Sequence, residues 1–193
     1  MKRLLILMAI IIIASSLFGC TETKKTEEVY AYNGETDITV DGRSFKLEDT
    51  PENMAEEIVV NNFLYYIIAD FDRMSNIVPH KISIESLEKN FNDDIYIQSY
   101  IIHKISTLSE SEYSQRELEN GEQNPLYYYG MQEIIKNYNL IEYEIINVNF
   151  TQTHSEESNE LIPQWGDGTY YRNFIVGKSP NDSGYKIYDF GMM

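Results

Sequence analysis

The chain is poor in cysteine, tryptophan and basic residues. Among its 193 residues there is one cysteine, Cys20, and one tryptophan, Trp165. A single cysteine excludes an internal disulfide, so the lone thiol needs another explanation. Basic residues number 15 against 31 acidic ones, which gives a formal net charge of −16. A surface this acidic repels phosphate backbones, so we expect no nucleic-acid partner.

Recognisable catalytic motifs are also missing. The sequence contains no phosphate-binding loop, dinucleotide fingerprint, nucleophile elbow or metal-binding helix motif. The histidines His80, His103 and His154 lie in different segments, and none has a second candidate ligand four residues away. We expect His80 and His154 to be exposed and His103 to lie in a packed segment. No metal site, no cofactor and no enzymatic activity are predicted.

The apolar run at the N-terminus is too short to span a bilayer comfortably, because a spanning helix needs about 20 apolar residues. Lys2 and Arg3 precede an apolar stretch from Leu4 to Ala14, and Gly19 precedes Cys20. A charged start, a short apolar region and a small residue before the cut are typical of a secretory signal. We therefore expect residues 1–19 to be a signal peptide. The alternatives are an ordinary signal peptide with an incidental cysteine, and an uncleaved anchor.

The segment Leu17-Phe18-Gly19-Cys20 resembles the lipobox of bacterial lipoproteins. The resemblance implies that the Cys20 thiol receives a diacylglyceryl group and that the chain is cut just before it. Phe18 departs from the pattern, because that position usually holds a small or β-branched residue. A diacylglyceryl group supplies two acyl chains, and two chains anchor stably where one binds only marginally. The resemblance thus implies a lipid anchor at the extracytoplasmic face of the cell membrane.

The stretch after Cys20 is polar and charged. From Thr21 to about Glu35 it has no apolar period, which is typical of a flexible tether. We divide the chain into the signal peptide, the lipidated cysteine with its tether (20–36) and a single α+β domain (37–193). The domain comprises a β-hairpin at 37–48, indicated by Asp41-Gly42 between alternating runs, and a core at 50–193.

The core begins with patterns typical of helices. Apolar residues at helical spacing predict one long helix from Pro51 to about Asn76, with Thr50 as its N-cap. A short helix is expected at 84–91, and another at 126–138. Residues 95–108 fit either a helix or a strand, and we favour a strand or a mixed segment. Residues 109–124 are predicted to form a loop or a frayed helix.

The last third of the chain alternates with the period of a β-strand. Within the strand expected from residue 141 to residue 150, the inward parity flips at Ile145-Ile146, which predicts a β-bulge or a strong bend. Residues 170–176 and 185–192 are expected to form an antiparallel hairpin. Helices followed by strands predict an α+β fold, with N-terminal helices packed on a curved antiparallel sheet.

This order resembles the cone-like fold of the nuclear transport factor 2-like superfamily. The resemblance rests on the helix Pro51–Asn76, which ends in Asp70-Phe71-Asp72-Arg73-Met74, and on the closing strand Tyr185–Phe190. Enzymes of that fold often use an Asp–His pair inside a pocket. The resemblance therefore implies Asp189 and His103 as the possible pocket residues. By the alternation of the strand, Asp189 would share a face with Tyr185 and Ile187.

Two hypotheses for function remain open. The first is a non-enzymatic module at the cell surface that binds a protein, a peptide or a cell-wall component. Its possible contact residue is Trp165, in the loop Ile162–Gly168. The second is a pocket protein of the cone fold that binds a small ligand or is weakly catalytic. A deep cavity containing Asp189 and His103 would favour the second hypothesis, and a filled core would favour the first.

Overall fold

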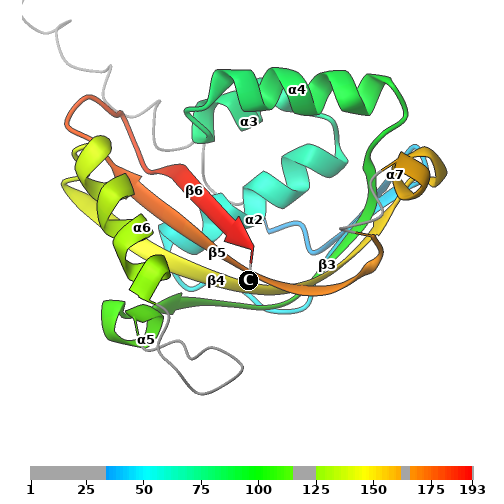
Figure 1. Ribbon diagram of the computed structural model, residues 1–193. Helices are drawn as coiled ribbons and strands as arrows, with labels where there is room; N and C mark the ends of the chain where they lie inside the picture. Colours follow the sequence, from blue (N-terminus) through cyan, green and yellow to red (C-terminus); the bar gives the residue numbers. More distant parts are fainter. Residues whose placement is uncertain (1–33, 115–124, 162–165, 193) are drawn as a thin grey trace, which may run out of the picture.

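The computed structural model describes residues 34–114, 125–161 and 166–192. Cys20, the expected signal peptide, the tether up to residue 33 and Trp165 lie outside the described residues. The described chain is an α+β fold, as predicted (Figure 1). In chain order its elements are β1 (Asp37–Val40), β2 (Arg43–Leu47), α2 (Met54–Ile67), α3 (Phe71–Ile77), α4 (Lys81–Asn92), β3 (Ile97–Leu108), α5 (Glu110–Ser114), α6 (Pro125–Asn137), β4 (Glu142–His154), α7 (Glu156–Leu161), β5 (Gly168–Lys178) and β6 (Lys186–Met192).

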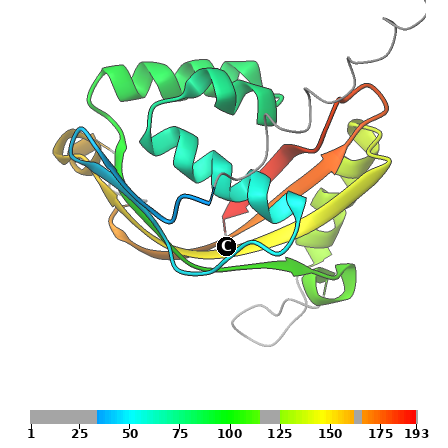
Figure 2. The same ribbon diagram turned by 180° about the vertical axis from the view of Figure 1, so that it is seen from behind.

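Six strands form one open sheet in the order β1-β2-β3-β4-β5-β6. The sheet curves around α2, and α3 and α4 form a further layer over that helix (Figures 1 and 2). Neighbouring strands are antiparallel except β2 and β3, which are parallel. The expectation of a purely antiparallel sheet is therefore wrong at this pair. The chain passes through α2, α3 and α4 between β2 and β3, and such a helical crossover is what joins parallel strands.

The predicted hairpin is confirmed. Asp41 and Gly42 connect β1 to β2, and both have positive φ angles, 48° and 79°. A type I′ turn requires positive φ at both central residues, which explains the Asp-Gly pair. A two-stranded ribbon is marginal alone, and here β2 gains a second neighbour in β3.

The long helix predicted from Pro51 to Asn76 is two helices. At its start, Asn53 rather than Thr50 is the N-cap, because its Oδ1 accepts a hydrogen bond from the Glu56 N–H at 2.9 Å. At the other end, α2 stops at Ile67, and Ala69 lies in the left-handed region with φ of 57°.

Two hydrogen bonds close this end of α2. The Ala69 N–H donates to the Tyr66 carbonyl at 3.1 Å, and the Asp70 N–H donates to the Tyr65 carbonyl at 2.8 Å. These are the two bonds of a Schellman motif, which satisfies the last carbonyls of a helix. Asp70 then caps α3 by accepting from the Arg73 N–H at 3.0 Å. Helical periodicity continues across the break, so the apolar pattern alone conceals it.

Ile145 and Ile146 are buried on opposite faces of the sheet. Ile146 belongs to the large core between the sheet and α2, whereas Ile145 packs in a second cluster with Met131 of α6 and Tyr113 of α5. The pairing of β4 with β5 runs from Glu142 to Gln152 without a shift. The predicted bulge at this dipeptide is therefore wrong: both side chains are apolar because helices cover both faces of this part of the sheet.

Most of the remaining elements agree with the sequence patterns, whereas the short helix α7 was not predicted. Residues 97–108 form the strand β3, the favoured alternative, and α4, α6 and the β5–β6 hairpin lie where expected. The polar stretch after β3 contains the short helix α5, and residues 115–124 lie outside the described residues.

Candidate ligand-binding cavity

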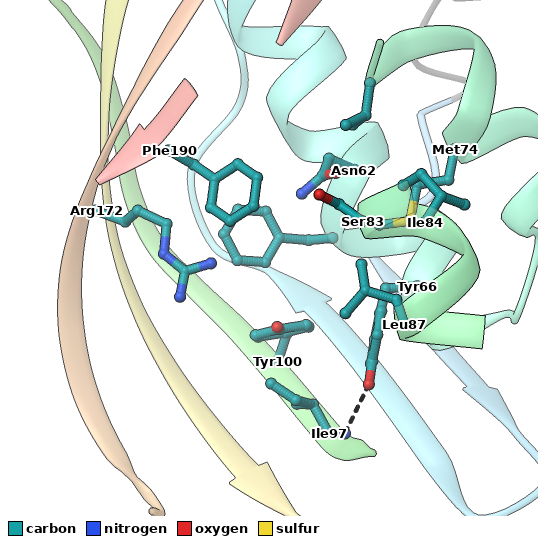
Figure 3. A pocket seen from close by; sticks show the side chains of 12 residues that line it. Asn62, Tyr66, Met74, Ser83, Ile84, Leu87, Ile97, Tyr100, Arg172 and Phe190 are labelled. Carbon is teal, nitrogen blue, oxygen red and sulfur yellow. Dashed lines mark hydrogen bonds between the residues drawn. The ribbon is translucent and has the colours of Figure 1, made fainter. Parts of the chain in front are cut away.

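A cavity of about 240 Å³ lies between the helices and the concave face of the sheet (Figure 3). Its walls come from α2, α3, α4, β3, β5 and β6. The wall is mostly apolar or aromatic, through Phe63, Tyr66, Met74, Ile84, Leu87 and Tyr100. Polar groups are few, and they are contributed mainly by Asn62, Ser83 and Arg172. Ligand sites in proteins typically combine such a lining with a few polar groups.

The inner wall is built by buried aromatic rings. Phe63 of α2 is 1% exposed, and its ring meets the Tyr100 ring of β3 edge-on, with 4.8 Å between centroids. At the opposite side, Phe190 near the end of β6 is 43% exposed, and Ser83 is also exposed. We therefore place the mouth of the cavity near Phe190, Ser83 and Asn62, which lie close together in Figure 3.

Arg172 brings a positive charge to this wall. Its guanidinium points into the cavity (Figure 3) and lies 5.4 Å from the Phe150 ring centroid and 5.7 Å from that of Phe190. Burial lowers the pKa of Arg172, and the neighbouring Tyr100 partly offsets this effect. Arginine nevertheless stays protonated in proteins. Among the described lining residues, Arg172 is the one that carries a charge at neutral pH.

The two tyrosines of the cavity stay neutral. Burial raises the pKa of Tyr66 and of Tyr100 above the ordinary tyrosine value. The Tyr66 hydroxyl accepts a hydrogen bond from the Ile97 N–H at 3.3 Å, which joins α2 to the start of β3. Neither hydroxyl releases its proton near neutral pH. Both hydroxyls therefore remain neutral hydrogen-bonding groups in the lining.

Asp189 does not line this cavity. Ile187 pairs with Val176 and Asp189 pairs with Ile175, so Tyr188 is an extra residue, a β-bulge, on β6. Cross-strand partners project from the same face. Asp189 therefore shares the face of Ile175, away from α2, where it is exposed. The expectation that Asp189 and Ile187 share a face is wrong, and the bulge turns Phe190 toward the cavity instead.

His103 lies outside the cavity too, on a second bulge. Ile102 pairs with Phe150 and Lys104 with Asn149, which leaves His103 as the extra residue of β3. The side chain is exposed, and its Nδ1 and Nε2 lie 2.8 Å from Glu48 Oε2 and 2.7 Å from Thr151 Oγ1. The structure thus does not bring His103 and Asp189 together.

The other histidines also differ from expectation. The His154 side chain is 9% exposed and lies beside Asp167, with 3.3 Å between His154 Nδ1 and Asp167 Oδ1. His80 is half-buried, and the Tyr138 hydroxyl lies 3.1 Å from its Nε2. Among the described residues, no group of three or more His, Cys, Asp or Glu side chains is placed to hold a metal ion.

Arg172 and Phe190 are the site residues that the sequence analysis missed. A usable signal existed for Arg172, because the alternation of β5 places it in register with Tyr170, Phe174 and Val176, which pack in or against the core. A basic residue is rarely buried at an inward position of a strand unless it is paired. Phe190 gave no comparable signal, since its orientation depends on the bulge at Tyr188.

Comparison with known proteins gives no relative. No protein-family model, no curated protein and no solved structure matches the chain. Among the helices in the described ranges, none is both long and apolar enough to cross a membrane.

Proposed function

We propose that this protein is a non-enzymatic binding module whose ligand is a small molecule held in the cavity between α2, α4 and the sheet. The observation that carries the proposal is the cavity itself, a space of about 240 Å³ with an apolar wall and one guanidinium. A densely packed core leaves few voids larger than a water molecule. A void of this size with a mouth at the surface therefore supports binding.

The module works at the extracytoplasmic face of the cell membrane, held by a diacylglyceryl group on Cys20 after removal of residues 1–19. This part of the proposal rests on the lipobox-like segment ending at Cys20 and on the polar stretch that follows it. The domain adopts a cone-like fold similar to that of the nuclear transport factor 2-like superfamily. The curvature of the sheet around α2 supports this part of the proposal (Figure 2).

Photolabelling with an uncharged probe tests whether the cavity is a binding site. The full chain, in phosphatidylcholine vesicles, is irradiated with an eight-carbon alcohol that carries a diazirine, and the labelled peptides are mapped by mass spectrometry. We expect labels on the peptides that contain Leu87 of α4 and Tyr100 of β3, and loss of the labels when unmodified octanol is added. Labels spread over the chain, with no competition by octanol, would refute the cavity as a binding site.

A matched pair of variants sharpens this test. In Leu87→Trp the larger side chain fills part of the cavity, so labelling of the Tyr100 peptide should fall severalfold. In Leu161→Trp the same change is made at a residue of α7 that is 65% exposed. Labelling in that variant should match the parent. Equal labelling in both variants would contradict the proposed location.

The anchor is tested separately by Cys20→Ser. We expect the variant to incorporate no labelled fatty acid and to remain unprocessed or to leave the membrane fraction. Phe18→Ala is the control, because it moves the segment toward the usual lipobox pattern and should be processed at least as well as the parent. Unchanged lipid incorporation and processing in Cys20→Ser would refute the anchor.

A further inference from the structure

We infer that the cavity selects an uncharged aromatic compound with a single ring, which packs between Phe190 at the mouth and Tyr100 on the inner wall. The inference rests on the proposed binding function and adds the chemical class of the ligand. It follows from the aromatic rings that line the cavity, from the neutral groups at its mouth and from its volume.

Aromatic side chains from three separate elements line the cavity. Phe63 and Tyr66 come from α2, Tyr100 from β3 and Phe190 from β6. The Tyr100 ring meets Phe63 edge-on and also lies in an edge contact with Tyr66, with 6.2 Å between the centroids of the two tyrosines. Such contacts between rings add to the free energy gained from apolar burial. A ligand ring extends this arrangement, whereas a saturated group of the same size gains from burial alone.

Phe190 supplies a ring where the ligand enters. Its side chain is 43% exposed although it lines the cavity. An exposed large apolar group beside a pocket is typical of a contact site. Figure 3 shows Phe190, Tyr100 and Leu87 around the same space. A ring that enters past Phe190 therefore lies between that side chain and the inner wall.

The polar groups of the lining favour a neutral ligand. Asn62 and Ser83 supply an amide and a hydroxyl, and none of the described lining residues is a carboxylate. The Arg172 guanidinium is already engaged within the protein, where it lies over the rings of Phe150 and Phe190. A charged ligand loses its hydration on entry, which is costly unless a new partner replaces the water. An uncharged ligand avoids that cost.

The volume limits the ligand to one ring with a short substituent. An apolar cavity of about 150 Å³ takes one benzene molecule. On that scale, the 240 Å³ of this cavity accommodates on the order of ten non-hydrogen atoms. Phenethyl alcohol has about this size. It also carries one neutral hydroxyl, a group that the Asn62 amide or the Ser83 hydroxyl can hydrogen-bond.

Competition between matched compounds tests the inference. The full chain in phosphatidylcholine vesicles is labelled with the photoreactive alcohol in the presence of phenethyl alcohol or its saturated analogue cyclohexylethanol. The competing concentrations are compared in the lipid phase, after measurement of vesicle partitioning, so that the difference in hydrophobicity cancels. We expect phenethyl alcohol to compete at a concentration about fivefold lower, the gain typical of an aromatic pair.

Two charged analogues test the second part of the inference. Phenylacetate and phenethylammonium keep the ring and carry opposite charges near neutral pH. Compared by aqueous concentration, both should compete at least about tenfold more weakly than phenethyl alcohol, because neither finds a replacement for its lost hydration.

Substitution of Phe190 identifies the ring responsible. In Phe190→Leu the preference for phenethyl alcohol over cyclohexylethanol should fall at least about twofold, while octanol still competes. Tyr171→Leu removes a ring of β5 that is 52% exposed and lies outside the cavity lining, and it should leave the preference unchanged. Thermal unfolding of each variant checks that it is folded.

The outcomes separate the inference from the proposed function. If octanol competes but phenethyl alcohol is no better than cyclohexylethanol, or if Phe190→Leu keeps the full preference, the aromatic class is refuted while the cavity stands as a binding site. If phenylacetate or phenethylammonium is the strongest competitor, the uncharged class is refuted. If no probe labels the cavity peptides in the parent chain, the proposed function itself fails.

Discussion

The Arg172 guanidinium on β5 lies 5.7 Å from the centre of the Phe190 ring on β6, at the wall of the cavity. Burial lowers the pKa of Arg172, which means that folding disfavours its charged form. The same guanidinium lies 5.4 Å from the centre of the Phe150 ring, and contact with aromatic rings stabilises a cation.

Replacement of Arg172 by methionine should therefore not weaken the fold. Methionine is also long and flexible, and it carries no charge to desolvate. We expect the free energy of unfolding of Arg172→Met to rise by about 1 kcal/mol. Urea denaturation of the full chain, followed by far-ultraviolet circular dichroism, measures the change. A loss of more than about 1 kcal/mol would show that Arg172 is a structural residue.

Replacement of Ala69 by glycine should increase the free energy of unfolding. It occupies the left-handed position that ends α2, with φ of 57°, where a Cβ costs about 1–2 kcal/mol. Glycine removes that strain but gains freedom in the unfolded chain, worth about 0.4–1 kcal/mol. The net expectation for Ala69→Gly is a rise of about 0.5–1 kcal/mol in the free energy of unfolding.

The control for this change is the same substitution inside α2. Ala55 is 2% exposed and helical, so Ala55→Gly should lower the free energy of unfolding by about 1 kcal/mol or more. Denaturation curves of the two variants should therefore move in opposite directions. A similar loss in both would contradict the strain assigned to Ala69.

The sequence predicted the secondary structure better than it predicted the site. Periodicity located the α+β order, the Asp41-Gly42 hairpin and the closing strands, because each of these depends on local patterns. Periodicity gave the wrong side-chain orientation where one extra residue in a strand changes which face the following side chains occupy. His103 and Tyr188 are both bulge residues, and the bulge at Tyr188 moves Asp189 out of the register of Ile187.

The sequence analysis also predicted a bulge where there is none, and the reason is again that a local pattern does not show which face of a strand is covered. Two adjacent apolar residues, Ile145 and Ile146, suggested a bulge where β4 continues regularly. A strand covered on one face alternates, whereas a strand covered on both faces does not. Which faces are covered is decided by the packing of α2 and α6, and a local window of sequence does not contain that information.

Gly177 on β5 should not tolerate a side chain. A Cβ built there would lie 2.7 Å from the Glu142 carbonyl oxygen of β4, closer than real Cβ atoms come to backbone. Glu142 and Gly177 lie in hydrogen-bonded neighbouring strands, so relief requires a backbone shift. We expect Gly177→Ala to lower the free energy of unfolding by about 1–3 kcal/mol.

Gly130 of α6 provides the matched control. A Cβ there meets nothing within 4 Å, and alanine favours a helix over glycine by about 1 kcal/mol. Gly130→Ala should therefore raise the free energy of unfolding, measured by the same urea titration. Equal effects of the two substitutions would mean that the crowding at Gly177 is relieved without cost.

Asp182, in the turn between β5 and β6, should make stability depend on pH in the acid range. Burial alone would raise its pKa. The Tyr188 hydroxyl, the Ser179 N–H at 2.8 Å and the Lys186 ammonium at 3.0 Å stabilise the carboxylate, so that the pKa falls to about 2. The pKa of an unfolded aspartate is about 3.9. The stabilisation is therefore complete above about pH 4 and is lost as the pH falls through about 2.

Asp182→Asn removes the charge and keeps the shape of the side chain. At pH 7 we expect it to lower the free energy of unfolding by about 1 kcal/mol, since solvent at the turn screens part of the interaction. Thermal unfolding between pH 7 and pH 2 should show the parent and variant curves converging below pH 4. Asp189→Asn, at an exposed residue of β6, is the control and should leave the free energy of unfolding at pH 7 nearly unchanged. If the Asp182→Asn curve instead stays parallel to that of the parent down to pH 2, the carboxylate does not hold the turn.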